Sequence, residues 1–148
     1  MSEKARGYAH RVDVAVEGQL VWLALTESRS LRRWCSPKAE IRAEAGGLFR
    51  ASVDRVTELE AHIDVFDRGR RMRLIYMTSS LLPRAESVLI DDFILEPANP
   101  GTIVRLLGSG YPGSADWDVP YLRLRTGWQQ AMSRLKVFVE KLSDRGTP

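Results

Sequence analysis

The sequence predicts one α+β domain in which an antiparallel sheet is covered by a long C-terminal helix. Three observations favour this class. Between residues 41 and 110, short stretches of alternating apolar and polar residues follow one another with tight turns between them. From about residue 120, apolar residues recur at three- and four-residue steps instead. The length of 148 residues fits a single domain.

The N-terminal part is expected to form a strand and two short helices. Val12, Val14 and Val16 alternate with polar residues, which is typical of a half-buried strand. Residues 20–25 are too densely apolar for a one-sided helix and are expected to form a short buried one. Residues 28–34 follow as a second short helix, which Pro37 ends.

Strands joined by short turns must pair antiparallel, because parallel pairing needs a long crossover. The region after Pro37 is therefore expected to form a meander, and the first strand is expected to complete the same sheet. The predicted strands of the meander lie at Ile41 and at residues 49–53, 59–66, 72–76, 86–96 and 102–110.

The C-terminal helix is expected to begin near Asp116 or Asp118, with Pro120 in its first turn. About 24 residues of helix would span about 36 Å. A helix of that length with one apolar face is expected to lie across the sheet. Its apolar stripe consists of Tyr121, Leu124, Trp128, Met132, Leu135, Val139 and Leu142.

Composition excludes several classes of protein. The net charge of +3 arises from 22 basic and 19 acidic residues that alternate along the chain, and the one basic cluster, residues 68–73, falls in an expected turn. We therefore expect no nucleic-acid partner. No apolar run is long enough to insert into a membrane. A single cysteine, Cys35, favours a cytoplasmic location, and His10 and His62 are too isolated for a metal site, so no cofactor is expected.

Segments spread along the chain resemble the landmarks of a known family, in the same order. They are residues 21–26 (VWLALT), 31–37 (LRRWCSP), 46–49 (GGLF), 101–106 (GTIVRL) and 127–128 (GW). The chain is similar to members of the SRPBCC (START-like) superfamily, in the group named after the activator of heat-shock protein 90 ATPase.

The resemblance implies a helix-grip fold over residues 8–143, with residues 1–7 and 144–148 as flexible termini. It also implies a cavity between sheet and helix that often holds a hydrophobic small molecule, without one shared reaction. Two departures stand out. Gly108 replaces a His or another polar residue of many relatives, and Arg68-Gly69 replaces a Pro-Pro turn.

Asp91 and Asp92 are the most informative exception to the pattern of the predicted strands. They are two adjacent acidic residues in a strand whose flanking residues are apolar. Successive strand residues face opposite sides, so one carboxylate should face the cavity, and the family register favours Asp91. A buried carboxylate without a partner is costly. Two roles for these carboxylates are open. They are either solvated or paired with an arginine, for which Arg105 is the candidate, or one of them anchors a ligand hydroxyl or amine.

Tyr76, Tyr121 and Trp128 are expected to point between sheet and helix, where their polar atoms could orient a ligand. Trp22 and Trp34 are interpreted as ordinary core. The predicted lining of the cavity comprises Phe49, Val65, Leu74, Tyr76, Asp91, Phe93, Val104, Leu106, Tyr121, Leu124, Trp128 and Met132.

Residues 108–113 have the form GxGxxG, but no parallel strand follows the helix, so a nucleotide site is not expected. We interpret the segment as a flexible loop over the cavity mouth.

Three functions follow, in order of preference. The first is binding of a hydrophobic or amphipathic small molecule without chemistry. The second is a chaperone-regulating interaction module, weakened because the match covers only the C-terminal domain of the eukaryotic activator. The third is a cyclase- or dehydratase-type enzyme with Asp91 as general acid or base and Tyr76 or Tyr121 as donor. No catalytic residue is assigned, and a homodimer through an exposed edge strand is left open.

Overall fold

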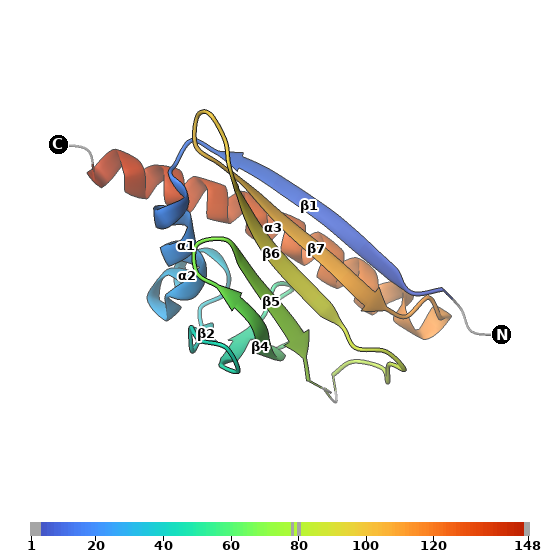
Figure 1. The fold of residues 1–148 in the computed structure, drawn as a ribbon. Coiled ribbons are helices and arrows are strands. Elements are labelled where there is room, and N and C mark those ends of the chain that lie inside the picture. Colours follow the sequence, from blue (N-terminus) through green and yellow to red (C-terminus); the bar gives the residue numbers. More distant parts are fainter. Residues whose placement is uncertain (1–3, 78, 80, 147–148) are drawn as a thin grey trace.

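A computed structural model describes residues 4–77, 79 and 81–146 of the chain (Figure 1). Its strands are β1 (Arg6–Val14), β2 (Glu40–Ile41), β3 (Leu48–Ala51), β4 (Leu59–Asp67), β5 (Arg71–Tyr76), β6 (Ile90–Pro97) and β7 (Thr102–Tyr111). Its helices are α1 (Gly18–Thr26), α2 (Ser28–Trp34), the short 3₁₀ helix η1 (Ala115–Trp117) and α3 (Asp118–Gly146).

Within the described residues, seven strands form one antiparallel sheet in the order β1-β7-β6-β5-β4-β3-β2. The predicted meander is thus confirmed from β2 to β7, and β1 completes the sheet by pairing with β7, from Val14 opposite Thr102 to Arg6 opposite Tyr111. The sheet is curved, and α3 runs along one side of it while α1 and α2 lie together at one end (Figure 1). This arrangement confirms the predicted α+β helix-grip class.

Helix α3 buries the predicted stripe from Tyr121 to Val139, but Leu142, its last predicted member, is exposed. Leu124, Trp128, Leu135 and Val139 are fully buried, whereas Arg123 on the opposite face is exposed. The helix begins at Asp118, after η1 has buried Trp117. None of the described helices combines the length and hydrophobicity needed to cross a bilayer.

Some of the expected element boundaries differ from the observed ones. Strand β1 begins at Arg6 and α3 continues to Gly146, so parts of the expected flexible termini belong to regular elements. The other terminal positions of that prediction, residues 1–3 and 147–148, lie outside the described residues. The strand expected at 86–96 begins only at Ile90.

The expected lid at residues 108–113 is wrong for its first four residues. Gly108–Tyr111 belong to β7, and Tyr111 is fully buried. Gly110 adopts a φ of 81°, which a side chain would disfavour, and a Cβ there would meet the carbonyl oxygen of Val88. The glycines therefore serve close packing within the sheet.

A β-bulge in β4 corrects one predicted position. The register with β5 shifts between Ile63 and Val65, which leaves Val65 opposite Arg73 and brings Phe66 opposite the buried Met72. A bulge adds one residue and so reverses the alternation of faces. Phe66 consequently packs on Trp22, at 5.4 Å between ring centroids, and Val65 is half-exposed instead of lining the interior.

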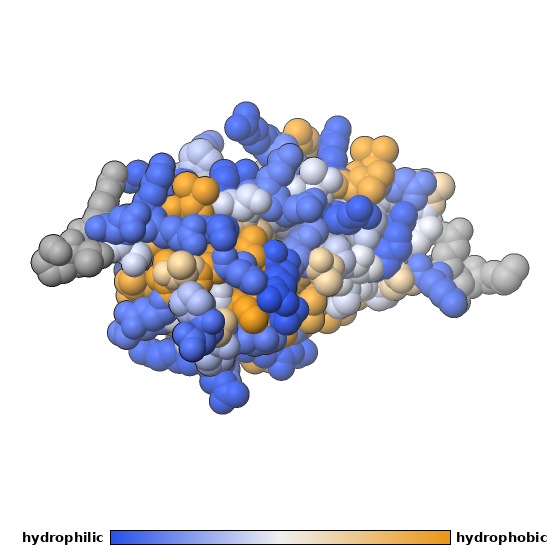
Figure 2. All heavy atoms as spheres, turned by 90° about the horizontal axis from the view of Figure 1, so that it is seen from above, coloured by the Kyte–Doolittle hydropathy of each residue, from blue (hydrophilic) through white to orange (hydrophobic). Residues whose placement is uncertain are grey.

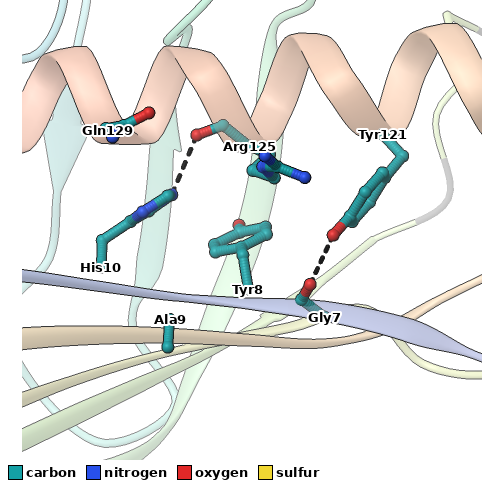
Figure 3. Close-up of a pocket in the computed structure, with 7 residues that line it drawn as sticks. All are labelled: Gly7, Tyr8, Ala9, His10, Tyr121, Arg125 and Gln129. Atoms are coloured by element: carbon teal, nitrogen blue, oxygen red, sulfur yellow. Dashed lines mark hydrogen bonds between the residues drawn. The ribbon is translucent and has the colours of Figure 1, made fainter.

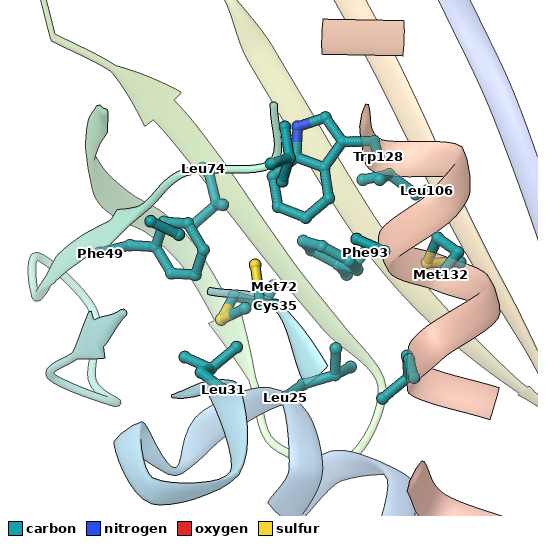
Figure 4. Packing of buried hydrophobic residues seen from close by; sticks show 14 of the residues in the cluster. Leu25, Leu31, Cys35, Phe49, Met72, Leu74, Phe93, Leu106, Trp128 and Met132 are labelled. Carbon is teal, nitrogen blue, oxygen red and sulfur yellow. The ribbon is translucent and has the colours of Figure 1, made fainter. Parts of the chain in front are cut away.

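The core lies between the sheet, α3 and the two short helices (Figure 4). Trp128 of α3 packs against Phe93 of β6 edge to face, at 5.5 Å between centroids, and lies 6.5 Å from Phe49 of β3. Trp34, which was interpreted as ordinary core, is buried and donates its indole N–H to the Ala24 carbonyl at 2.9 Å. The interior is therefore closely packed around Trp128.

Candidate functional site

Asp91 faces the interior and is fully buried, as the family register led us to expect. Asp92 points to the outer face, where Arg71 binds it through two guanidinium nitrogens at 2.7 and 3.0 Å. Arg105, the expected partner of the pair, instead binds Glu96 at 2.7 Å. The register places Arg105 opposite Ile94, midway between Asp92 and Glu96, and Arg71 already binds Asp92.

Tyrosine hydroxyl groups surround the Asp91 carboxylate. Tyr76 of β5 donates to Oδ2 at 2.6 Å, and Tyr111 of β7 lies 3.2 Å from the same oxygen. Tyr8 of β1 donates to Oδ1, and its hydroxyl is 3.0 Å from that of Tyr111. Three different strands thus bring donors to one carboxylate.

The reach of Tyr8 depends on Gly108. In the sheet, Tyr8 lies opposite Gly108, and Gly108 lies opposite Asp91. A Cβ on Gly108 would come within 2.4 Å of the Tyr8 ring. The missing side chain of Gly108 therefore leaves room for the Tyr8 ring to cross β7 and for its hydroxyl to reach Asp91.

No ion pair within the described residues involves Asp91, since the arginines on neighbouring strands bind other acids: Arg71 binds Asp92, Arg73 binds Asp64 and Arg105 binds Glu96. Burial without a cation raises the pKa of the Asp91 carboxyl to about 7, although the hydrogen bonds from Tyr76, Tyr8 and Tyr111 lower it. Burial and the nearby carboxylate raise the pKa of each of these tyrosines well above its ordinary value.

The cluster can accept a proton without leaving a polar atom unpaired. When Asp91 is ionised, Tyr8, Tyr76 and Tyr111 all point hydroxyl protons toward it. When Asp91 is protonated, it can donate to Tyr8, Tyr8 to Tyr111, and Tyr111 back to the other carboxyl oxygen. A hydroxyl both donates and accepts, so the ring of hydrogen bonds closes when Asp91 is protonated. When Asp91 is ionised, Tyr8 and Tyr111 each use their proton on the carboxylate, and no proton lies between the two hydroxyls.

Trp128 contributes a further polar group. Its Nε1–H is buried and lacks a hydrogen-bond partner within the described part of the chain, yet it lies close enough to Asp91 to lower the pKa of that carboxyl. An unpartnered buried donor is uncommon in folded proteins and costs about 1–3 kcal/mol.

Most of the predicted lining residues meet in the interior. Apart from Val65 they are buried, and they comprise Phe49, Leu74, Tyr76, Asp91, Phe93, Val104, Leu106, Tyr121, Leu124, Trp128 and Met132. Their side chains belong to one packed cluster, of which Figure 4 shows the part around Trp128. Tyr121 does not reach Asp91, because its hydroxyl donates to the Gly7 carbonyl instead.

A groove of about 280 Å³ opens beside this cluster, between β1 and α3 (Figure 3). Gly7, Tyr8, Ala9 and His10 form one wall, and Tyr121, Arg125 and Gln129 form the other. Bonds from Tyr121 to Gly7 and between His10 Nε2 and the Arg125 carbonyl, at 2.9 Å, join the two walls. The half-buried Tyr8 lines the groove and also contacts Asp91, so its ring separates the buried carboxylate from solvent.

Sequence reasoning missed Tyr8 and Tyr111. Tyr8 precedes the valines of the first strand by an even number of residues, which already placed it on their face. A glycine inside a strand often marks the close approach of another group, so Gly108 was the available signal. Tyr111 was assigned to a loop by the GxGxxG interpretation.

Cys35 and the potential metal ligands among the described residues form no further candidate site. Burial raises the pKa of the Cys35 thiol to about 12, which keeps it protonated and unreactive. Within the described residues, no three His, Cys, Asp or Glu side chains lie close enough together to bind a metal ion.

Comparison with known proteins identifies the family of this chain. A family model described as activator of Hsp90 ATPase homolog 1-like protein matches residues 15–140. No curated protein matches the sequence.

Several solved structures share the fold. Protein MLL2253 from Mesorhizobium loti is 22% identical, with a TM-score of 0.77 over 97% of this chain and 100% of its own. The Aha1 dimer from Colwellia psychrerythraea is 17% identical, with a TM-score of 0.77 over 91% of this chain and 96% of its own. CalU16 from Micromonospora echinospora is 19% identical, with a TM-score of 0.71 over 95% of this chain and 80% of its own.

Proposed function

Because this chain belongs to the family of activator of Hsp90 ATPase homolog 1-like proteins, whose fold packs a sheet against a long helix, we propose that it binds a small amphipathic molecule between α3 and the sheet. The observation that carries the proposal is Asp91, a carboxylate that is fully buried and has no cationic partner within the described residues. Three tyrosine hydroxyls donate to it, but no positive charge balances the ionised form, which is therefore costly to bury.

The polar groups around Asp91 indicate which functional group a ligand should carry. The Asp91 carboxylate accepts hydrogen bonds, whereas the Trp128 indole N–H offers an unused donor close to it. A hydroxyl group both donates and accepts, so one ligand hydroxyl satisfies both groups. The surrounding side chains, including Phe49, Phe93 and Leu106, are apolar and suit a hydrocarbon or aromatic body.

The groove between β1 and α3, which Tyr8 lines, provides the route (Figure 3). The half-buried Tyr8 ring covers Asp91, so rotation of this ring would open the way to the carboxylate. Because the interior is closely packed, the ligand must displace side chains or widen the gap between α3 and the sheet. Binding is therefore expected to be slower than a diffusion-limited encounter.

Titration calorimetry with 2-naphthol tests this proposal, with 2-methylnaphthalene as the isostere that lacks the hydroxyl. We expect 2-naphthol to bind at least tenfold more tightly to the native protein, and the preference to disappear in Asp91→Asn. Asp92→Asn is the matched control, because the neighbouring carboxylate faces outward and pairs with Arg71. Equal affinity for the two probes, or no binding of 2-naphthol, would overturn the proposal.

Native mass spectrometry of freshly purified protein separates binding from catalysis. A lipophilic hydroxylated molecule that co-purifies and is recovered unchanged supports binding. Conversion of an added hydroxylated probe, abolished by Asp91→Asn, would instead support the enzyme alternative, in which an Asp91 carboxyl with a pKa of about 7 transfers a proton.

The chaperone-regulating role is the other alternative, and the family description is its only support. On the face shown in Figure 2, hydrophobic groups are separated by hydrophilic ones and form no broad apolar surface. Small-molecule binding is therefore the function that the arrangement around Asp91 favours.

A further inference from the structure

A second groove lies away from the Asp91 cluster, at the end of the domain where α2, the β3–β4 connection and α3 meet. Its volume is about 730 Å³, within the range of small-molecule sites. The buried side chains of Trp34, Cys35 and Val53 line its floor. The protonated Cys35 thiol behaves there as a small apolar group.

Basic side chains without an ionic partner stand around this floor. Arg33, Lys38 and Arg55 line the groove and are exposed, and within the described residues none of them forms an ion pair. Several other arginines, such as Arg50, Arg71 and Arg73, have their charge balanced by a neighbouring acid.

Two acids, Asp54 and Glu58, also line the groove, but neither forms an ion pair with these cations. Asp54 accepts the backbone N–H groups of Val56 and Thr57, at 2.9 and 2.6 Å, and the Thr57 hydroxyl at 2.8 Å. Glu58 lies 3.9 Å from Arg50. The groove therefore keeps an uncompensated positive charge above an apolar floor.

Other basic residues build the walls. Arg134 of α3 donates to the Trp34 carbonyl at 2.8 Å and to that of Cys35 at 3.3 Å, and Arg32 donates to the Ala39 carbonyl at 3.0 Å. The Arg134 bonds fix the end of α2 against α3, and the Arg32 bond fixes the segment that follows α2. The floor of the groove is consequently held in place.

Arg55 is also held in an unfavourable backbone conformation. Its φ of 66° lies in the left-handed region, which a long side chain seldom adopts. The Asp54 hydrogen bonds fix the loop in this shape and so present a guanidinium at the groove. Backbone strain of this kind tends to persist at functional sites.

We infer that this groove binds a small amphipathic carboxylate, with its hydrocarbon body on Trp34 and Val53 and its charged group among Arg33, Lys38 and Arg55. Charge complementarity selects the anion, and the apolar floor selects a ligand with a hydrocarbon part. The inference is independent of the Asp91 site.

Titration with decanoate tests the inference, with decanol as the neutral probe of the same length. We expect decanoate to bind at least tenfold more tightly than decanol at low ionic strength, and its affinity to fall as salt is raised. Arg33→Gln and Lys38→Gln should each weaken decanoate about three- to tenfold. Arg68→Gln, an exposed arginine in the β4–β5 turn, is the control and should leave the affinity unchanged.

Arg55→Gly separates the effect of the Arg55 charge on binding from an effect on folding. Glycine adopts a positive φ without strain, so the thermal midpoint should not fall, while decanoate affinity should drop as in the other variants. Equal binding of decanoate and decanol, no binding of decanoate, or unchanged affinity in Arg33→Gln, Lys38→Gln and Arg55→Gly would overturn the inference. Loss of decanoate binding in Asp91→Asn would assign the probe to the interior and would also overturn it.

Discussion

The Tyr8 ring reaches Asp91 only because Gly108, which lies between them in the sheet, has no side chain. A single glycine thus decides which polar groups meet in the interior. Elsewhere in a strand, glycine weakens packing and costs backbone entropy. Here that cost is offset by a further hydrogen bond to a buried carboxylate, which is worth more than a bond between neutral groups.

Gly108→Ala is therefore expected to destabilise the protein by about 1–3 kcal/mol, the usual cost of overpacking a closely packed site. The new methyl group would displace the Tyr8 ring and break its bond to Asp91. Chemical denaturation of both proteins measures the change. In a Tyr8→Ala background the ring is absent, so the same substitution should cost much less. Additive effects of the two substitutions would contradict this explanation.

The residue scale also shows the limit of sequence reasoning about the site. Alternation of faces predicted that one of Asp91 and Asp92 turns inward, but not which atoms would meet it. The contacts of Tyr8 and Tyr111 depend on the register of β7 with β6 and with β1, and the latter pairs residues about a hundred positions apart. The local sequence pattern contains no information on this pairing. Tyr111 was also missed because the GxGxxG interpretation assigned it to a loop.

At the scale of elements, α3 approaches the β3–β4 connection through another glycine. A Cβ on Gly127 would lie 2.7 Å from the Val53 carbonyl oxygen and 2.9 Å from its carbon. Backbone atoms cannot move aside as a flexible side chain can. The position of α3 over the sheet is thus fixed by a close contact between helix and loop backbone.

Gly127→Ala is expected to lower the free energy of unfolding by about 1–2 kcal/mol, because overpacking against backbone outweighs the gain of about 1 kcal/mol in helix propensity. Thr126→Ala, at the exposed neighbouring position, should instead stabilise the helix by about 0.5 kcal/mol. Urea denaturation of the three proteins measures both changes. A stabilised Gly127→Ala variant would show that the helix can move away from Val53 at little cost.

Helices and strands were predictable where their pattern of apolar residues extends over many neighbouring positions. The stripe from Leu124 to Val139 could indicate only a one-sided helix, and the short turns between the strands allowed only an antiparallel meander. The bulge that turns Val65 outward could not be anticipated, because a bulge adds a residue without changing the sequence pattern around it. The start of β6 at Ile90 likewise depends on its pairing with Ile75 and Ser109.

For the whole molecule, the buried carboxyl couples folding to pH. Asp91 has a pKa of about 7 in the folded protein and about 4 in an unfolded chain. Between these values the folded state holds a proton that the unfolded state has released. The contribution of Asp91 to stability is therefore fully present below pH 4 and is lost as the pH rises through 7.

The free energy of unfolding is consequently expected to fall between pH 4.5 and 7.5, by up to about 4 kcal/mol from this group. Burial lowers the pKa of His10, which acts in the opposite direction over part of the same range, so the difference between two proteins is the useful quantity. Guanidinium denaturation of the native protein and of Asp91→Asn, at several pH values, measures that difference. Asn cannot titrate, so the decline should be absent from the variant, whereas Asp92→Asn should keep it. Parallel pH profiles for the native protein and Asp91→Asn would mean that Asp91 is ionised throughout and that the tyrosine hydroxyls alone compensate its charge.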